Sequence, residues 1–103
     1  MVVFNNDEEC MEWLLDAIAD TVGTKATFIR GSTSLYAWAN DAEDVYDILR
    51  DVQYQLEGFE FDKGVEVNVE TINDVYQILK DHPELFIKNE LETQDSQPQP
   101  RAM

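Results

Sequence analysis

Three segments of the chain carry apolar residues at the three- and four-residue spacing of an amphipathic helix. They cover residues 7–22, 42–56 and 72–81. Trp13 lies beside the apolar stripe of the first segment. The positions that this spacing places inward in the first two segments are Cys10, Leu14, Ala17, Ile18, Val45, Ile48, Leu49, Val52 and Leu56. The pattern predicts three helices, each with one buried face.

Polar residues and helix breakers mark where these helices begin and end. Asn6 followed by Glu9, and Asp41 followed by Asp44, resemble capping boxes. In such boxes, side chains satisfy the free N–H groups of the first helical turn. The predicted C-terminal stops are Gly23, Gly58 and the pair His82-Pro83.

Short apolar runs between the helices predict strands. Val65, Val67 and Val69 alternate with polar residues, at the period of a half-buried strand. The predicted strands cover residues 3–4, 26–29, 35–39, 59–61 and 65–69. The element order is then β-α-β-β-α-β-β-α, an α+β fold in which an antiparallel sheet has its helices on one face. Its first six elements match a ferredoxin-like core, to which one strand and one helix are added.

One pattern occurs three times along the chain. Its copies begin at Val3, Trp38 and Asn68, and each consists of a short apolar strand, a polar cap and an amphipathic helix. The last two copies share the motif Asp-Val-Tyr-x-Ile-Leu-basic-Asp at a separation of 30 residues. The sequence therefore predicts an internal repeat.

Length and composition favour one domain. Of the 103 residues, 44% are apolar, which is enough for a hydrophobic core. We predict a single acidic α+β domain at residues 1–91, with residues 83–91 as a last short helix capped by Asp81. Residues 92–103 contain Gln-Pro-Gln-Pro and are predicted to form a flexible tail.

The chain also carries indications of its compartment. No apolar run is long enough to span a membrane, and the N-terminus lacks the pattern of a secretion signal. Cys10 is the only cysteine and has no disulfide partner in the chain, which fits a reducing compartment. We expect a cytoplasmic protein, or one of the host cytoplasm if a phage encodes it.

Charge is the strongest compositional feature. The chain has 22 acidic and seven basic residues, for a formal net charge of −15. Residues 1–20 contain six acidic residues and no basic one, and residues 41–62 contain eight acidic residues and one basic one. Because like charges repel, such a protein is expected to avoid nucleic acid and anionic membranes. Its expected partner is a basic protein.

In two of the helices the acidic residues recur every four positions. Spacing of four places successive carboxylates on one helix face, about 6 Å apart along the axis. The two ridges consist of Glu8, Glu12, Asp16 and Asp20 in the first helix, and of Glu43, Asp47 and Asp51 in the second. Phosphates of one DNA strand lie about 3.4 Å apart along the duplex axis. The ridges are therefore candidates for mimicry of a nucleic-acid backbone, and the third helix has Gln77 where the second has Asp47.

Three explanations of this acidity stay open at this point: a functional origin, which we favour, adaptation to high salt, and simple solubility. The favoured explanation depends on the missing counter-charge. Helices commonly place Lys or Arg four residues after Glu, and such an oppositely charged pair stabilises the helix by roughly a few tenths of a kcal/mol. Two like charges at the same spacing destabilise the helix by about the same amount. The first helix contains no basic residue and accepts that repulsion.

Tyr36 and Trp38 form a second candidate contact surface. They alternate with Leu35, Ala37 and Ala39, so in a strand both rings would lie on the sheet face that the helices leave open. Exposed Tyr and Trp are favoured binding anchors. The alternative is that a loop or the C-terminal segment covers them. The apolar run at residues 85–87 is open to two interpretations as well, as core or as a homodimer contact.

The sequence provides little for catalysis. His82, the only histidine, stands beside a proline at a helix end, and Cys10 has acidic neighbours in Glu8, Glu9 and Glu12, which would raise the pKa of its thiol. Residues 41–44 resemble a calcium loop only faintly, without its glycine and its last glutamate. No phosphate-binding loop, Cys-x-x-Cys or basic-aromatic nucleic-acid motif occurs. We expect no enzymatic activity, cofactor or specific metal site.

These observations favour a non-enzymatic acidic binding protein that mimics nucleic acid and blocks the basic DNA- or RNA-binding site of another protein. In size and charge it is similar to small phage-encoded inhibitors of restriction, of CRISPR and of host nucleic-acid enzymes. The alternatives are an immunity- or antitoxin-type partner of one basic toxin, and a structural module that assembles through its aromatic or apolar segments.

Overall fold

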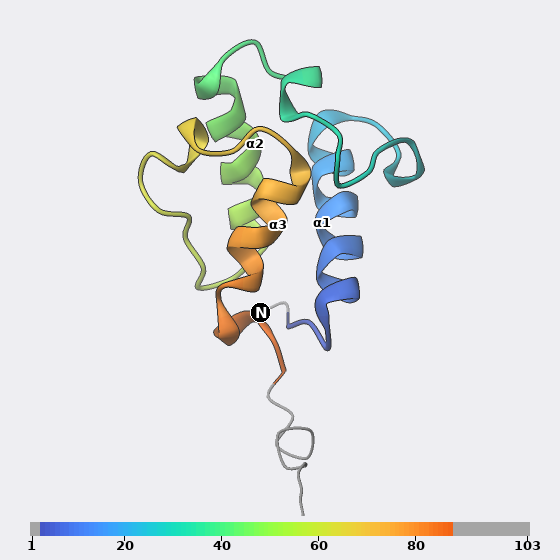
Figure 1. The fold of residues 1–103 in the computed structure, drawn as a ribbon, viewed down its shortest axis with the longest axis vertical. Coiled ribbons are helices and arrows are strands. Elements are labelled where there is room, and N and C mark those ends of the chain that lie inside the picture. The colour runs from blue at the N-terminus through green and yellow to red at the C-terminus, as the bar shows by residue number, and fades with distance from the viewer. Residues whose placement is uncertain (1–2, 88–103) are drawn as a thin grey trace, which may run out of the picture.

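The computed structural model describes residues 3–87, and in this part of the chain the regular elements are helices (Figure 1). The α-helices are α1 (Asp7–Val22), α2 (Ala42–Tyr54) and α3 (Ile72–Lys80). The connecting segments contain the short 3₁₀ helices η1 (Ala26–Phe28), η2 (Leu35–Ala37), η3 (Val65–Val67) and η4 (Pro83–Leu85).

The predicted helix boundaries are confirmed to within two residues, and their caps explain why. The side chains of Asn6 and Asp41 accept hydrogen bonds from the N–H groups of Glu9 and Asp44. Gly23 ends α1 in the left-handed conformation, with φ of 82°, which is open to glycine because it has no Cβ. These signals act within a few residues of the helix ends. The helix boundaries therefore do not depend on how the rest of the chain folds.

The prediction of an antiparallel sheet with a ferredoxin-like core is wrong. Within the described residues there is no named strand, and the only β contacts are isolated bridges between Phe4 and Phe86 and between Ser34 and Thr71. Three of the five segments predicted as strands, residues 26–29, 35–39 and 65–69, contain 3₁₀ turns instead. In η3 the N–H of Val67 donates to the carbonyl of Gly64, and in η2 the N–H of Ala37 donates to that of Ser34.

The alternating valines predicted a strand at residues 65–69, but only two of the three are buried. Val65 and Val69 lie in the core, whereas Val67 is 70% exposed. The buried residues are therefore four positions apart, as a 3₁₀ turn followed by extended chain requires. Leu35 and Ala39 repeat this spacing before α2. In residues 35–39 the N–H groups of Ala37, Trp38 and Ala39 donate within the turn, and only that of Leu35 donates to a distant carbonyl, that of Glu70.

Helix α1 packs against both other helices (Figure 1). Lys80 at the end of α3 reaches Asp7 at the start of α1, with 3.6 Å between Nζ and Oδ2. Residues at the end of α1 likewise share a surface hollow with the first turns of α2. Both α2 and α3 therefore run antiparallel to α1.

The core positions predicted from the helical spacing are confirmed. All nine of the predicted inward residues are buried, and Trp13 packs against them from a partly buried position. The loops add Leu35, Phe59 and Val65 to the same cluster, and among the described residues no polar or charged residue is buried. The core is thus continuous across the three helices and the turns between them.

The internal repeat is confirmed as a structural unit, although its first element is a turn rather than a strand. In the last two copies a 3₁₀ turn, a cap and an α-helix follow one another in the same register. The cap bonds also repeat: the backbone N–H of Asn40 donates to Asp44, and that of Glu70 donates to Asp74. The first copy begins directly at its cap, where the N–H of Asn5 donates to Glu9.

The C-terminal predictions are tested only in part. Residues 83–85 form a single 3₁₀ turn, and His82 rather than Asp81 precedes it, without a side-chain cap. Leu85 is buried and Phe86 packs against the core, so the apolar run is largely internal. The predicted boundary at residue 91 and the tail at residues 92–103 lie outside the described residues. Over the described residues, no helix is both long and apolar enough to cross a membrane.

Candidate interaction surface

The four ridge carboxylates of α1 are all exposed to solvent. Glu8, Glu12, Asp16 and Asp20 form no salt bridge with any residue between 3 and 87. Asp7, which is not part of the ridge, is the α1 residue that pairs with a lysine. The ridge of α1 is therefore a row of negative charge without a counter-charge in the described part of the chain.

The ridge of α2 is exposed as well. Glu43, Asp47 and Asp51 all face solvent, and among the described residues only Asp47 of the three forms a salt bridge. Arg50 lies 3.5 Å from its carboxylate, measured from Nη2 to Oδ1, within the same helix. Both partners are about half exposed, so this pair is weakened by water and screened by salt. It leaves the ridge with a negative balance.

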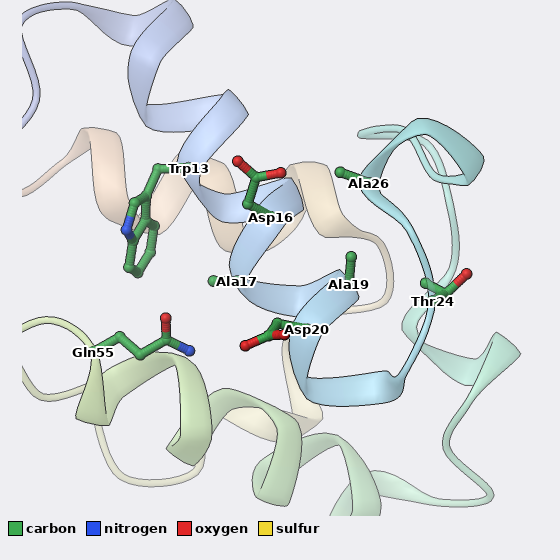
Figure 2. A pocket seen from close by; sticks show the side chains of 8 residues that line it. All are labelled: Trp13, Asp16, Ala17, Ala19, Asp20, Thr24, Ala26 and Gln55. Atoms are coloured by element: carbon green, nitrogen blue, oxygen red, sulfur yellow. The ribbon is translucent and has the colours of Figure 1, made fainter.

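Residues of both ridges flank the groove between α1 and α2. One hollow there, of about 390 Å³, is lined by Asp16 and Asp20 of α1 and by Gln55 at the end of α2. Figure 2 shows that Trp13 and Gln55 point into this hollow from the two helices, with Asp20 beside them. Further along the groove, Asp47 lines a second hollow of about 460 Å³. Each ridge thus borders a hollow between the two helices, Asp16 and Asp20 the first and Asp47 the second.

A second group of carboxylates caps the helices and is not part of the exposed ridges. Glu9 accepts hydrogen bonds from the side chain and backbone of Asn5, which hold the pKa of its carboxyl below the usual value. Asp74 accepts from the backbone N–H groups of Thr71 and Glu70, which lowers its pKa in the same way. These acids begin helices, where the helix dipole also favours negative charge. They are separate from the ridges, although in the sequence both groups are acidic residues of predicted helices.

Tyr36 and Trp38 do not form the common surface that a strand would give them. Tyr36 belongs to η2, is 41% exposed, and borders a hollow beside Val67 and Asn68. Trp38 ends that turn, packs against the core, and borders the groove between α1 and α2 near Asp47. A separation of two residues places side chains on one face only in extended chain. The predicted shared face is therefore wrong, and whether either ring contacts a partner stays a prediction.

A further hollow, larger than the two described above, was not predicted. It measures about 780 Å³ and lies between α2 and the segment 60–66, which the sequence suggested to be a hairpin. Ridge residue Glu43 and Tyr46 line it from α2, and Phe61 and Glu66 from the loop. No sequence signal could have located it, because it forms where the loop after α2 folds back onto that helix.

Cys10 is fully buried, as expected of a core cysteine. Burial, followed by the negative charge of Asp7, raises the pKa of its thiol to about 11. The expected direction of this shift is confirmed, but the charge that contributes belongs to Asp7 and not to Glu8, Glu9 or Glu12. At neutral pH the group is a thiol, which is a poor nucleophile.

His82 meets a carboxylate but not a cavity. Its Nδ1 lies 2.8 Å from Oε2 of Glu84, and its ring packs edge-on against Phe59 at 4.8 Å between centroids. It lines none of the main hollows described above. Among residues 3–87, no three His, Cys, Asp or Glu residues are placed to hold a metal ion together. Asp41 and Asp44, from the segment with a faint likeness to a calcium loop, form the α2 cap.

Comparison of the chain with models of protein families, with curated proteins and with solved structures found no significant match.

Proposed function

We propose that this protein is a non-enzymatic inhibitor that occupies the basic DNA- or RNA-binding site of another protein, in the cytoplasm in which that protein acts. The observation that carries the proposal is the α1 ridge, four exposed carboxylates at helical spacing with no salt bridge in the described chain. Display of unpaired charge costs stability, because like charges at this spacing repel. A basic partner surface would offset that cost by supplying the missing cations.

The arrangement of the ridges supports mimicry of a duplex rather than of a single charged strand. Asp16 and Asp20 of α1 line one hollow between α1 and the end of α2, and Asp47 of α2 lines a second hollow between the end of α1 and the start of α2. A duplex also presents two rows of negative charge with a groove between them. At a net charge of −15, long-range attraction would speed the encounter with a basic site, and added salt would slow it.

Affinity capture from bacterial lysate tests the proposal. The immobilised chain is expected to retain nucleic-acid-binding proteins at low salt, and added duplex DNA should displace them. In a variant with Glu12, Asp16, Asp47 and Asp51 changed to Lys, capture should disappear. Circular dichroism of the variant establishes that its helices are intact, since all four side chains are exposed.

A charge-matched control separates the ridges from net charge. Changing Glu57, Glu70, Asp81 and Glu84 to Lys alters the net charge equally, and these residues are exposed but lie outside both ridges and outside the hollow that Glu43 lines. This control should retain its partners. Equal loss of capture in both variants would reduce the effect to overall charge and would contradict the proposal.

The same experiment distinguishes the alternatives. One partner that is retained at high salt and ignores added DNA would favour a dedicated immunity- or antitoxin-type function. Self-association that rises with concentration in sedimentation would favour an assembly module, for which exposed apolar side chains such as Phe28 and Tyr54, each 74% exposed, are the available contacts. Unfolding at low salt would favour adaptation to a saline environment.

A further inference from the structure

The segment between α1 and α2 differs in charge from the rest of the molecule. Residues 21–40 contain Lys25 and Arg30 and no acidic residue, in a chain whose net charge is −15. Both cations are exposed, and neither forms a salt bridge with any residue between 3 and 87. The segment is therefore a basic surface without a counter-charge in the described part of the chain.

Phe28 lies between these two cations in the sequence and is 74% exposed. It ends the turn η1, in which its N–H donates to the carbonyl of Lys25. The chain turns again after Phe28, where the N–H of Arg30 donates to the hydroxyl of Thr33. Exposed aromatic side chains are favoured anchors of protein–protein contacts, because a partner removes a large apolar surface from water.

The fold holds this segment in place. Ile29, next to Phe28, is buried in the core. The N–H groups of Ile72 and Asn73, in the first turn of α3, donate to the carbonyls of Thr33 and Gly31 at 3.1 and 2.7 Å. These bonds fasten the segment to α3 before any contact forms, which lowers the entropy cost of binding.

The same segment borders the hollow between α1 and the end of α2. Ala26 of η1 lines this hollow together with Trp13 and Ala17 of α1 and the ridge carboxylates Asp16 and Asp20. Figure 2 shows Ala26 beside Asp16, with the ring of Trp13 pointing into the hollow. The hollow therefore combines apolar side chains with two carboxylates, and the basic turn lies at its edge.

Opposite charges lie around this hollow without pairing. Neither Asp16 nor Asp20 forms a salt bridge within the described residues, and neither does Lys25 or Arg30. Asp20 and Lys25 stay unpaired although they are only five positions apart. A surface with two free carboxylates and two free cations is complementary to a second copy of itself, because each copy supplies the charges that the other lacks.

We propose that two copies of the chain associate through this surface, with η1 of each copy lying over the hollow of the other. Phe28 of one copy enters the hollow beside Trp13 of the second copy, and the two cations pair with the two carboxylates across the interface. Such a contact is isologous, so every interaction occurs twice and association stops at two copies. It thereby differs from an assembly module, whose association continues as concentration rises. The inference goes beyond the inhibitor function and does not depend on it.

Sedimentation equilibrium of the full chain tests the proposal at about 0.15 M salt, where charges more than about 8 Å apart are largely screened. We expect monomers and dimers to exchange between about 10 µM and about 1 mM, without larger species. Phe28→Ser should weaken dimerisation about tenfold. Tyr54→Ser removes an equally exposed ring beside a different hollow and should change it by less than about twofold. A chain that stays monomeric, assemblies larger than two, or equal effects of the two substitutions would overturn the proposal.

Two charge-reversed variants test the pairing across the interface. One carries Asp16→Lys and Asp20→Lys, the other Lys25→Asp and Arg30→Asp, and circular dichroism checks that these exposed positions leave the helices intact. Each variant alone should dimerise about tenfold more weakly, because its surface then carries charges of one sign. The two variants should bind each other about tenfold more tightly than either binds itself. Their mixed dimer has the same total net charge as the wild-type dimer, so failure to associate cannot be attributed to overall repulsion and would contradict the proposed pairs.

The dimer and the inhibitor function fail in different ways. The dimer covers Asp16 and Asp20, so a basic protein that binds the α1 ridge has to separate the two copies. Phe28→Ser keeps every ridge carboxylate and should therefore capture lysate proteins at least as well as the wild type. If the wild type is monomeric but capture depends on the ridges, the inhibitor function stands and the dimer is wrong. If dimerisation depends on Phe28 while capture does not depend on the ridges, the dimer stands and the inhibitor function is wrong.

Discussion

The second and third copies of the repeat have the same local structure, but their helices differ in the charge of their exposed residues and in the contacts of their cations. Residues 34–51 and 64–81 each form a 3₁₀ turn, a cap and a helix, and corresponding residues occur 30 positions apart. Both helices carry a cation above a tyrosine ring, with 5.8 Å from Arg50 to Tyr46 and 5.2 Å from Lys80 to Tyr76. The two cations then act differently: Arg50 pairs with Asp47 of its own helix, and Lys80 pairs with Asp7 of α1.

This difference separates residues that maintain the fold from residues available to a partner. Tyr76 is partly buried, and the outer face of α3 carries the neutral Asn73 and Gln77. At the equivalent positions of α2 the chain has Glu43 and Asp47, and Tyr46 is 44% exposed. Because the two copies share a core pattern, the acids of α2 are not a requirement of the repeat. The first copy has Glu8 and Glu12 at the corresponding positions, so the third copy is the one that lacks these acids.

The largest expected effect concerns what the copies share. Leu49 and Leu79 occupy equivalent core positions with 1% and 0% exposure. Changing either one to Ala should reduce the free energy of unfolding by about 2–5 kcal/mol, because each leaves a cavity. Urea denaturation followed by circular dichroism measures this. Val67→Ala, at an exposed position where the second copy already has Ala37, is the control and should change stability by less than about 0.5 kcal/mol.

The next largest effect is expected at the exposed positions where α2 is acidic and α3 is neutral. Changing Glu43 to Asn and Asp47 to Gln gives α2 the residues that α3 has at these positions. We expect partner capture to weaken about tenfold while the free energy of unfolding changes by less than about 1 kcal/mol, since both side chains are exposed. Quantitative capture and urea denaturation of the same variant measure the two quantities. A variant that keeps full capture would place the interface elsewhere.

A pH-dependent effect is expected at the cap of the third copy. The backbone bonds from Thr71 and Glu70 hold the pKa of Asp74 below its ordinary value of 3.8. Because the folded-state pKa is the lower one, this group stabilises the protein above the unfolded-state pKa, and the contribution is lost as pH falls through the folded value. The stability difference between wild type and Asp74→Asn should therefore shrink from about pH 6 to about pH 2.5. Denaturation at several pH values measures it, and a difference independent of pH would contradict this role.

The smallest effect concerns the two cations. Lys80→Ala breaks a pair that joins α3 to α1 and should cost about 0.2–1 kcal/mol. Arg50→Ala breaks a pair within one helix and should cost less than about 0.5 kcal/mol. Both costs should fall in high salt, as thermal denaturation with and without added salt will measure. A larger cost at Arg50 would mean that it restrains repulsion within the α2 ridge.

Much of the candidate surface was predictable because exposure follows from helical spacing alone. The seven ridge carboxylates lie on the solvent faces that the apolar stripe leaves open, and all seven are exposed. Which of them border the hollows between α1 and α2 was not predictable, since it depends on how the two helices pack. The hollow of Tyr46, Phe61 and Glu66 depends on how the loop after α2 folds back onto that helix, where the N–H of Phe61 donates to Gln53, eight positions earlier.

By itself, the sequence determined the helices, their caps, their buried stripes and the repeat, because each depends on interactions within a few residues. Asn6, Asp41 and Gly23 act on the turn next to them, and Leu14 or Leu49 faces inward through the helical period. Only the tertiary structure decided between strands and turns at residues 35–39 and 65–69. A strand requires a distant partner, whereas a 3₁₀ turn satisfies its own backbone groups. Alternation of valines cannot distinguish these outcomes, because both bury Val65 and Val69.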